Sequence, residues 1–287
     1  MTSQPCILGS VPAHARSLTF EVRAHADPRP GLARLLPLVG PDTTVIGLGE
    51  PLARALGKEV PGLRVFPSLV LSRTAAAIPS TQGALWVLLH GADRGETADR
   101  ADAVIAALGT HFLVSDAVDA FKYREGRDLT GYLDGTENPA GDKARAAAIA
   151  TDGGSFVAVQ RWVHDLPHFA ALASKERDHT IGRSLEGNEE IADAPPTAHV
   201  KRAAQESFEP EALLVRRSMP WMSDHAKGIL FLAYGESLDR YERILRRMVG
   251  LEDGIVDALF GFSRPMTGGY YYCPRLTGGR VDASFFA

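Results

Sequence analysis

Alternating apolar and polar residues predict strands in the first half of the chain. Leu18, Phe20 and Val22 alternate with polar residues, which is typical of a half-buried strand. Residues 84–90 are nearly all apolar, as expected of a central strand covered on both faces. The same reasoning predicts further strands over residues 43–48 and 111–118, and helices over residues 31–38 and 97–108.

The second half of the chain repeats this order of elements. Strands are expected over residues 156–163, 212–218 and 228–234, and helices over residues 166–173 and 237–249. Residues 84–92 and 228–235 each combine an apolar strand with a glycine turn, and each leads into a helix that contains Asp-Arg. This internal repeat has low identity, but it indicates two halves of similar architecture.

These patterns predict an α+β fold made of tandem ferredoxin-like domains with antiparallel sheets. We place the N-terminal domain at residues 1–135 and the C-terminal domain at residues 136–287, because residues 131–154 are rich in glycine and proline. Residues 174–196 are polar, acidic and end in proline, so we expect a long loop there.

Composition narrows the class of protein. The 287 residues are 45% hydrophobic and 23% charged, which is typical of a soluble globular protein. A net charge of −4 gives no electrostatic support for binding nucleic acid or an anionic membrane. No apolar run approaches the roughly 20 residues of a membrane helix, and we find no signal peptide, so we expect a cytoplasmic protein. Cys6 and Cys273 form no CxxC or Cys/His cluster, and we expect two reduced thiols.

The segment from Gly131 to Pro139, Gly-Tyr-Leu-Asp-Gly-Thr-Glu-Asn-Pro, holds one carboxylate, Asp134, among turn-forming residues. No apolar period runs through it, so the segment is expected to be a loop. A carboxylate fixed in such a loop is either a turn cap or a working acid or base. Taken alone, the motif favours the turn cap, because aspartate commonly closes turns.

Two later motifs change this balance. His199 lies in Ala-His-Val-Lys-Arg, and Arg216 lies in Leu-Leu-Val-Arg-Arg-Ser-Met-Pro-Trp. A GxxDG turn, a later histidine and an Arg-x-Ser-Met-Pro-aromatic strand, in this order, resemble the dye-decolorizing peroxidases, and most closely their bacterial cytoplasmic branch. The resemblance covers most of the chain and is strongest from about Tyr123 to the end.

The resemblance implies a haem enzyme. It implies haem b, with its iron, held in the C-terminal half, and hydrogen peroxide and small aromatic reductants as reaction partners. It also implies the tandem ferredoxin-like fold and a homo-oligomer whose number of subunits the sequence does not fix. Neither nucleic acid nor a membrane is expected as a partner.

On one side of the haem, the resemblance makes His199 the iron ligand. A ligating histidine usually donates its other ring N–H to a carboxylate or carbonyl, which raises the basicity of the ring. Asp257 is our candidate for this partner. The alternative for Asp257 is a solvated helix residue.

On the other side, the resemblance assigns proton transfer to Asp134 and stabilisation of negative charge to Arg216. Without it, Arg216 would be read as a surface ion-pair residue. Strand alternation places Arg216 and Ser218 on one face and Arg217 on the other. Some relatives carry asparagine where Ser218 stands, and serine can donate a hydrogen bond there with shorter reach.

Other residues are expected around the cofactor. Met219 and one face of residues 228–234 would contact the haem, either Ile229 with Phe231 or Leu230 with Leu232. Arg183 and Arg202 are candidates for pairing with a haem propionate. The oxidisable residues Trp162, Trp221 and Tyr270 to Tyr272 either fill the core or carry electrons from a donor at the surface.

Alternatives to a peroxidase remain at this point. A non-catalytic haem carrier on the same fold would need the ligand but not Asp134 and Arg216. Chlorite-type chemistry on a similar fold is disfavoured by the GxxDG turn. A third possibility is an α+β enzyme with a carboxylate site and no haem.

Overall fold

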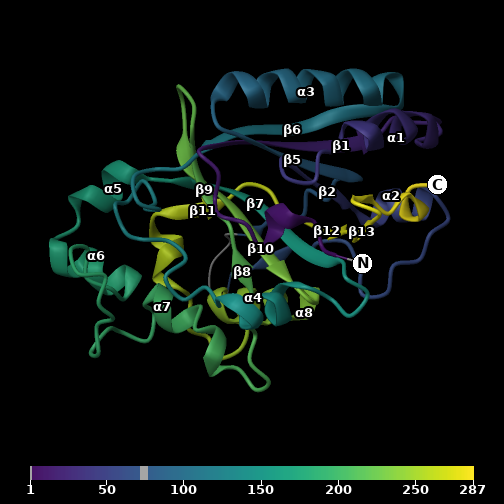
Figure 1. Ribbon diagram of the computed structural model, residues 1–287. Coiled ribbons are helices and arrows are strands. Elements are labelled where there is room, and N and C mark those ends of the chain that lie inside the picture. Colours follow the sequence, from purple (N-terminus) through teal and green to yellow (C-terminus); the bar gives the residue numbers. More distant parts are fainter. Residues whose placement is uncertain (1, 72–76) are drawn as a thin grey trace.

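Two groups of four antiparallel strands form one continuous sheet in the computed structural model, which describes residues 2–71 and 77–287 (Figure 1). The N-terminal group has the order β2-β5-β1-β6, with β1 (His14–Val22), β2 (Thr44–Leu48), β5 (Leu85–Gly91) and β6 (Phe112–Phe121). The C-terminal group has the order β12-β7-β10-β9, with β7 (Ser155–His164), β9 (Met219–Met222), β10 (Lys227–Gly235) and β12 (Gly269–Cys273). In both groups the first and third strands are central, which is the ferredoxin-like arrangement.

The two groups join edge to edge and close the sheet into a barrel. Tyr272 of β12 pairs with Leu48 of β2, and Ala120 of β6 pairs with Trp221 of β9. Because β7 also pairs with β10, the strands make a closed circuit. Closure protects the strand edges that two separate sheets would expose. The predicted tandem ferredoxin-like α+β fold is confirmed, and the expected boundary at residues 135 and 136 falls between β6 and β7.

Helices cover the outside of the barrel. Helices α1 (Arg29–Leu35) and α3 (Arg94–Leu108) lie along the N-terminal strands, and α4 (Gly141–Ala148) and α8 (Leu238–Met248) lie on the opposite side in Figure 1. Helices α3 and α8 each lie between the third and fourth strands of their four-strand groups, so the internal repeat corresponds to equivalent structural units. The remaining helices are α2 (Glu50–Ala55), α5 (Leu166–Ala171), α6 (Ser174–Ile181) and α7 (His199–Arg202). The remaining strands are β3 (Leu69–Val70), β4 (Ala77–Ile78), β8 (Val215–Arg216), β11 (Ser263–Pro265), β13 (Leu276–Thr277) and β14 (Arg280–Val281). Short 3-10 segments in the described residues are η1 (Pro5–Ile7), η2 (Leu36–Leu38), η3 (Gly109–His111), η4 (Gln205–Ser207), η5 (Ala258–Gly261) and η6 (Ala283–Phe285).

Strand alternation separates two hydrophobic clusters. On β10, Leu230, Leu232 and Tyr234 pack in the same cluster as Trp86 and Tyr271, whereas the alternate side chains of β10 pack with the covering helices. A strand that is buried on both faces reads as a nearly continuous apolar run, as residues 228–234 do. The face of β10 that carries Ile229 and Phe231 is the one available to a site beneath the helices.

Two sequence predictions are wrong in part. The first residues of the expected loop 174–196 form helix α6, which begins where Glu176 accepts the Ala173 N–H and ends at Gly182, with φ 95°. No side chain of α6 is buried, so the helix has no apolar stripe to reveal it. The strand expected over residues 212–218 is limited to β8, and a separate strand, β9, begins at Met219.

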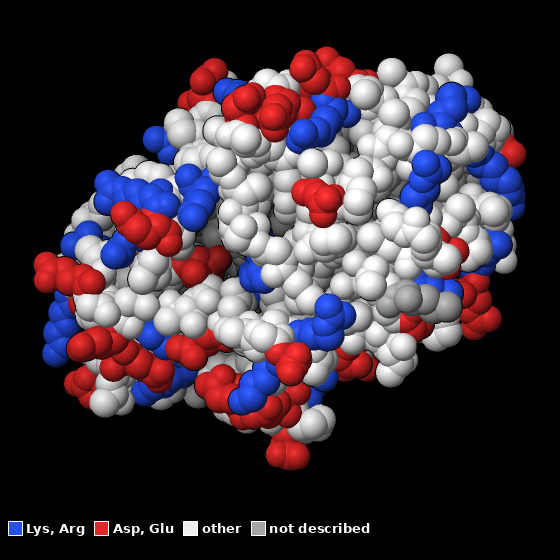
Figure 2. Space-filling view, viewed as in Figure 1, with Lys and Arg blue, Asp and Glu red and all other residues white. Residues whose placement is uncertain are grey.

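The distribution of surface charge and the state of the two cysteines agree with what the composition predicted. Lys and Arg side chains are interspersed with Asp and Glu on the face shown in Figure 2. Cys6 and Cys273 are buried and free, and burial raises the pKa of both thiols, that of Cys6 to about 11. Among the residues that the structure describes, no helix is long and apolar enough to span a membrane.

Candidate functional site

A tight hairpin between Gly126 and Asp134 fixes the carboxylate found in the sequence. The Asp134 N–H donates to Gly126 O (3.1 Å), and the Asp128 N–H donates to Tyr132 O (2.9 Å). Gly135 follows with φ 75°, and a Cβ at this position would come within 2.8 Å of Asn138 Nδ2. Glycine is therefore required on both conformational and steric grounds.

Asn138 ties this hairpin to the strand that carries Arg216. Its Oδ1 accepts the Arg216 N–H (2.8 Å), and its Nδ2 donates to Arg216 O (3.0 Å). The amide side chain thus pairs with β8 as a neighbouring strand would. Asn138 was expected only to form a turn, but it also sets the position of Arg216 relative to Asp134.

Three adjoining cavities meet at Asp134 and Arg216. The first, which we call the apolar cavity, holds about 950 Å³ of empty space, including its open part, and its lining residues run from Asp128 to Ser263. The second, the side cavity, holds about 720 Å³ and is also lined by Asp128, Ser218 and Met219. The third, the Arg183 cavity, holds about 1040 Å³ and is also lined by His199.

His199 enters the apolar cavity at the start of α7, with a carboxylate behind it. Its Nδ1 lies 2.7 Å from Oδ2 of Asp257, which is 1% exposed. The other oxygen of Asp257 accepts the Leu259 N–H (2.8 Å). His199 Nε2 has no hydrogen-bond partner within residues 2–71 and 77–287, so it is available to a metal in the cavity. The geometry matches the histidine–carboxylate pair proposed from the sequence, and Asp257 is not a solvated helix residue.

Arg216 and Ser218 present polar atoms that nothing else satisfies. Arg216 Nε and Ser218 Oγ are both buried without a hydrogen-bond partner in the described part of the chain. Both side chains line the side cavity together with Asp134, but Arg217 lines it as well. The alternation expected over these residues does not hold, because β8 ends at Arg216. Both unpartnered atoms could donate to a ligand or a water in this cavity.

The walls of the apolar cavity settle which face of β10 contributes. Ile229 and Phe231 line this cavity, whereas Leu230 and Leu232 pack inside the barrel. Met219 lies instead in the side cavity, beside Ser218. Trp162 also lines the apolar cavity, and its backbone oxygen accepts the Trp221 indole N–H (2.9 Å).

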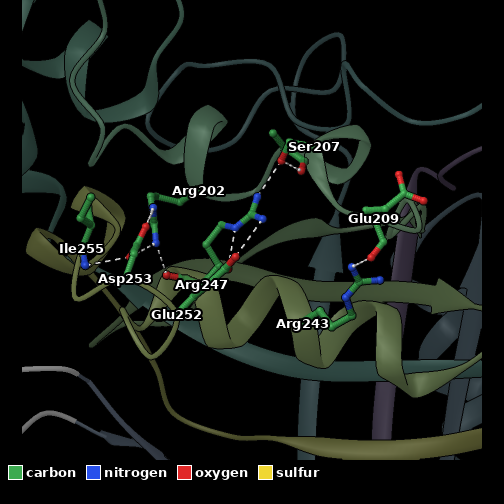
Figure 3. A network of polar contacts seen from close by, with 9 residues as sticks. Arg202, Ser207, Glu209, Arg243, Arg247, Glu252, Asp253 and Ile255 are labelled. Carbon is green, nitrogen blue, oxygen red and sulfur yellow. Dashed lines mark hydrogen bonds and ion pairs between the residues drawn. The ribbon is translucent and has the colours of Figure 1, made fainter.

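The two candidate propionate partners are placed differently. Arg183 lines the cavity named after it, where its guanidinium contacts Glu137, Glu190 and the Asn188 carbonyl. Arg202 lies outside all three cavities. It is 5% exposed and makes two 2.8 Å hydrogen bonds to Asp253 and one of 2.7 Å to Arg247 O (Figure 3). The structure therefore places Arg202, which was expected at the cofactor, away from the three cavities, because its Nη1 and Nη2 donate to Asp253 and Arg247 O and join α7 to the segment after α8.

We expect Arg202→Met to lower the free energy of unfolding by about 2 kcal/mol without changing cofactor affinity, because it removes hydrogen bonds to a charged group. The Arg202 guanidinium holds the pKa of Asp253 below its usual range. The stabilisation is thus complete above the ordinary carboxyl range and shrinks as the pH falls through the pKa of Asp253. Urea unfolding of the cofactor-free protein at two pH values measures this. Arg243→Met is the control, because Arg243 donates to the backbone carbonyls of Pro210 and Glu209 and lies over the Phe208 ring. Weakened cofactor binding in Arg202→Met would contradict this account and show that Arg202 contributes to the cofactor site.

Sequence reasoning missed a polar group in the apolar cavity. Asp128, His164 and Ser263 all line it and form a hydrogen-bonded chain. Burial disfavours the charged form of Asp128, but hydrogen bonds and charge from His164, with hydrogen bonds from Thr130, hold its pKa below the usual range. Gln160 Nε2 is also buried there without a partner among the described residues. No local spacing links these residues, so the sequence carried no signal for them.

The donor set fits a haem group. The apolar cavity holds His199, whose Nε2 could ligate the haem iron, together with Arg216 and Asp134. Haem proteins combine a proximal histidine with a polar, accessible opposite pocket. Within the described residues there is no cluster of three or more His, Cys, Asp or Glu side chains that would suggest a metal ion held by protein alone.

Comparisons with known proteins agree with this site. Residues 125–277 match the model of the Dyp-type peroxidase C-terminal family. This range includes the lining residues of all three cavities except Val11, Lys122 and Tyr123 of the side cavity. The chain is similar to dye-decolorizing peroxidases of Mycobacterium tuberculosis (31% identity over 228 residues, 74% of this chain and 67% of that protein) and Rhodococcus erythropolis (29% over 280 residues, 93% and 78%). It spans 59% of the length of a third relative, from Mycolicibacterium paratuberculosis, at 30% identity.

Solved structures extend the likeness over nearly the whole chain. A dye-decolorizing protein from V. cholerae has a TM-score of 0.85 at 28% identity, covering 94% of this chain and 96% of that one. DyPB from Rhodococcus jostii RHA1 has a TM-score of 0.85 at 27% identity, covering 95% and 96%. A variant of the R. jostii protein was solved in complex with heme.

Proposed function

Because the chain belongs to the dye-decolorizing peroxidase family, we propose that it is a haem-dependent peroxidase that uses hydrogen peroxide to oxidise small phenolic or dye-like donors. The observation that carries this proposal is that two pairs of residues lie at the same cavity. His199 with Asp257 supplies a ligand site, and Asp134 with Arg216 supplies acid–base and charge-stabilising groups. The assignment to the bacterial cytoplasmic branch and to a homo-oligomer rests on the motif resemblance alone.

The cofactor would be haem b held through His199. His199 Nε2 is the iron ligand, and its Nδ1–H donates to Asp257, which orients the ring and increases its electron donation. Phe231 and Ile229 supply apolar wall. Arg183 pairs with a propionate, exchanging its present carboxylate partners for the cofactor.

When bound, haem supplies the iron at which the peroxide O–O bond is cleaved. The residues of this chain supply the rest. Asp134 takes the proton from the attacking oxygen of peroxide and returns it to the leaving oxygen. The Arg216 guanidinium stabilises the negative charge that develops on the leaving oxygen. Ser218 Oγ, which is otherwise unpartnered, donates to peroxide or to a water beside it.

A non-catalytic haem carrier is the alternative on the same fold. Such a protein needs His199 and the apolar cavity only. A carrier would not need the two hydrogen bonds by which the Asn138 side chain holds the Arg216 backbone beside the Asp134 hairpin. Nor would it need the donors of Arg216 and Ser218, which have no partner among the described residues. These features favour the enzyme.

Asp134→Asn tests the proposal. We expect haem to stay bound and the reaction with peroxide to slow by about 10²-fold or more, because the amide cannot take up a proton. Stopped-flow absorbance of the Soret band measures the rate. Asp142→Asn, an exposed aspartate at the start of α4, is the matched control and should react as the wild type does. An unchanged rate in Asp134→Asn would return this residue to the role of a turn cap.

A further inference from the structure

A buried chain of three polar side chains lies between the apolar cavity and the side cavity. His164 Nδ1 lies 2.7 Å from Ser263 Oγ, and His164 Nε2 lies 3.3 Å from Asp128 Oδ1. His164 ends β7 and pairs in register with Ser263, the first residue of β11. The two strands and the Asp128 hairpin thus bring together residues separated by 36 and 99 positions in the sequence.

Only the first member of this chain reaches the side cavity. Asp128 lines both cavities, whereas His164 and Ser263 line the apolar cavity alone. The side chains of Asp128 and His164 are 13% and 4% exposed, and Ser263 is fully buried. Thr130 fixes the second carboxylate oxygen of Asp128 through its N–H (3.0 Å) and its hydroxyl (2.7 Å). The carboxylate is held in one orientation at the border of the two spaces.

The Asp128–His164 pair can store one proton. A proton added to the imidazole converts an anionic pair into a neutral ion pair, which a buried site favours over an isolated charge. Asp128 is the only charged group in contact with His164 within the described ranges, and the ring of Phe262 packs beside it. The neighbouring Asp165 is exposed and accepts the His168 N–H instead. The nearby Arg127 donates to the carbonyls of Gly131 and Leu185.

Oxidation of a phenol requires such a proton acceptor. Loss of one electron from a phenol breaks its O–H bond and gives a phenoxyl radical, a proton and an electron. In the proposed function the electron goes to the haem that peroxide has oxidised, and Asp134 has by then returned its proton to the leaving oxygen. The proton of the donor needs a base that faces the space where the donor binds. Both Asp134 and Asp128 line the side cavity, and Asp128 is the one whose carboxylate is joined to a buried imidazole.

We propose that Asp128, backed by His164 and Ser263, takes the hydroxyl proton of a phenolic donor bound in the side cavity. This inference rests on the proposed peroxidase function. Asp128 accepts the hydrogen bond of the phenol, the proton passes to the Asp128–His164 pair, and Ser263 holds the imidazole in place through Nδ1. The site would favour donors that lose a proton on oxidation over donors that lose an electron alone.

Two reductants separate this role from a structural one. Guaiacol releases a proton on oxidation, and ferrocyanide releases none. For Asp128→Asn we expect kcat/KM for guaiacol to fall by at least about tenfold more than kcat/KM for ferrocyanide measured on the same variant. The acid side of the guaiacol pH profile should also shift, because the group that accepts the proton has changed. His164→Gln, which keeps the carboxylate, should show the same selective loss, and the exposed His168→Gln is the control.

A measurement on cofactor-free protein gives an independent readout. In histidine-selective ¹⁵N NMR, Asp128→Asn should shift the ring-nitrogen resonances of His164 relative to the wild type, because the variant removes the anionic hydrogen-bond partner of Nε2. Equal losses with guaiacol and ferrocyanide, or an unchanged guaiacol rate, would overturn the proposal. Failure of the wild type to react with peroxide would instead overturn the proposed function, so the two failures are distinguishable.

Discussion

Arg216→Leu is expected to slow the reaction with peroxide by about 10²–10³-fold while haem remains bound. Removal of one preorganised donor that stabilises developing negative charge usually costs this much. The Arg216 backbone is held by two hydrogen bonds to the Asn138 side chain, so the position of this segment does not depend on substrate. The leucine keeps the strand register and removes only the charge and the donors.

Stopped-flow measurement at several peroxide concentrations gives the second-order rate constant. Arg216→Lys should fall between the wild type and Arg216→Leu, because it keeps a charge but lacks the planar set of donors. Haem content from the Soret band confirms that the cofactor is retained. A wild-type rate constant in Arg216→Leu would contradict the role given to this residue.

His199→Ala is expected to lower haem affinity by at least about 100-fold. Even residues that only support a metal ligand typically contribute 10–100-fold to metal affinity, and here the ligand itself is removed. Asp257→Asn should weaken binding by about 10–100-fold, because the amide cannot accept and orient the Nδ1–H as a carboxylate does. Haem affinity should therefore be highest in the wild type, lower in Asp257→Asn and lowest in His199→Ala.

Transfer of haem to apomyoglobin measures the loss of cofactor in each variant. Imidazole added to His199→Ala should restore part of the affinity, because it can occupy the vacated ligand position. His225→Ala removes an exposed histidine and is the control. Retention of haem by His199→Ala with wild-type affinity would show that another residue binds the iron.

Much of the fold follows from local patterns. Alternation along residues 18–22 and the apolar runs at 84–90 and 228–234 identify strands whose burial the structure confirms. The closure of the barrel was not predictable, because each junction between the halves is a single residue pair, Tyr272 with Leu48 and Ala120 with Trp221. Contacts between segments so far apart in sequence leave no periodic signal.

The site was predictable where a motif carried it. Asp134, Arg216, Ser218 and His199 meet around adjoining cavities because each lies in a recognisable segment. Arg202 was misplaced because α7 is one turn long and directs it to Asp253. The Asp128–His164–Ser263 chain was missed because its members come from a hairpin and two strands with no shared spacing.

The most direct test is the ultraviolet–visible spectrum of the haem-loaded protein mixed rapidly with hydrogen peroxide. The account predicts a ferric Soret band that shifts within the first turnover at a rate proportional to peroxide, and that returns on addition of a phenolic donor. A Soret band that stays unchanged or only bleaches would contradict the peroxidase and favour a haem carrier. Absence of any Soret band after exposure to haem would remove the cofactor from the account.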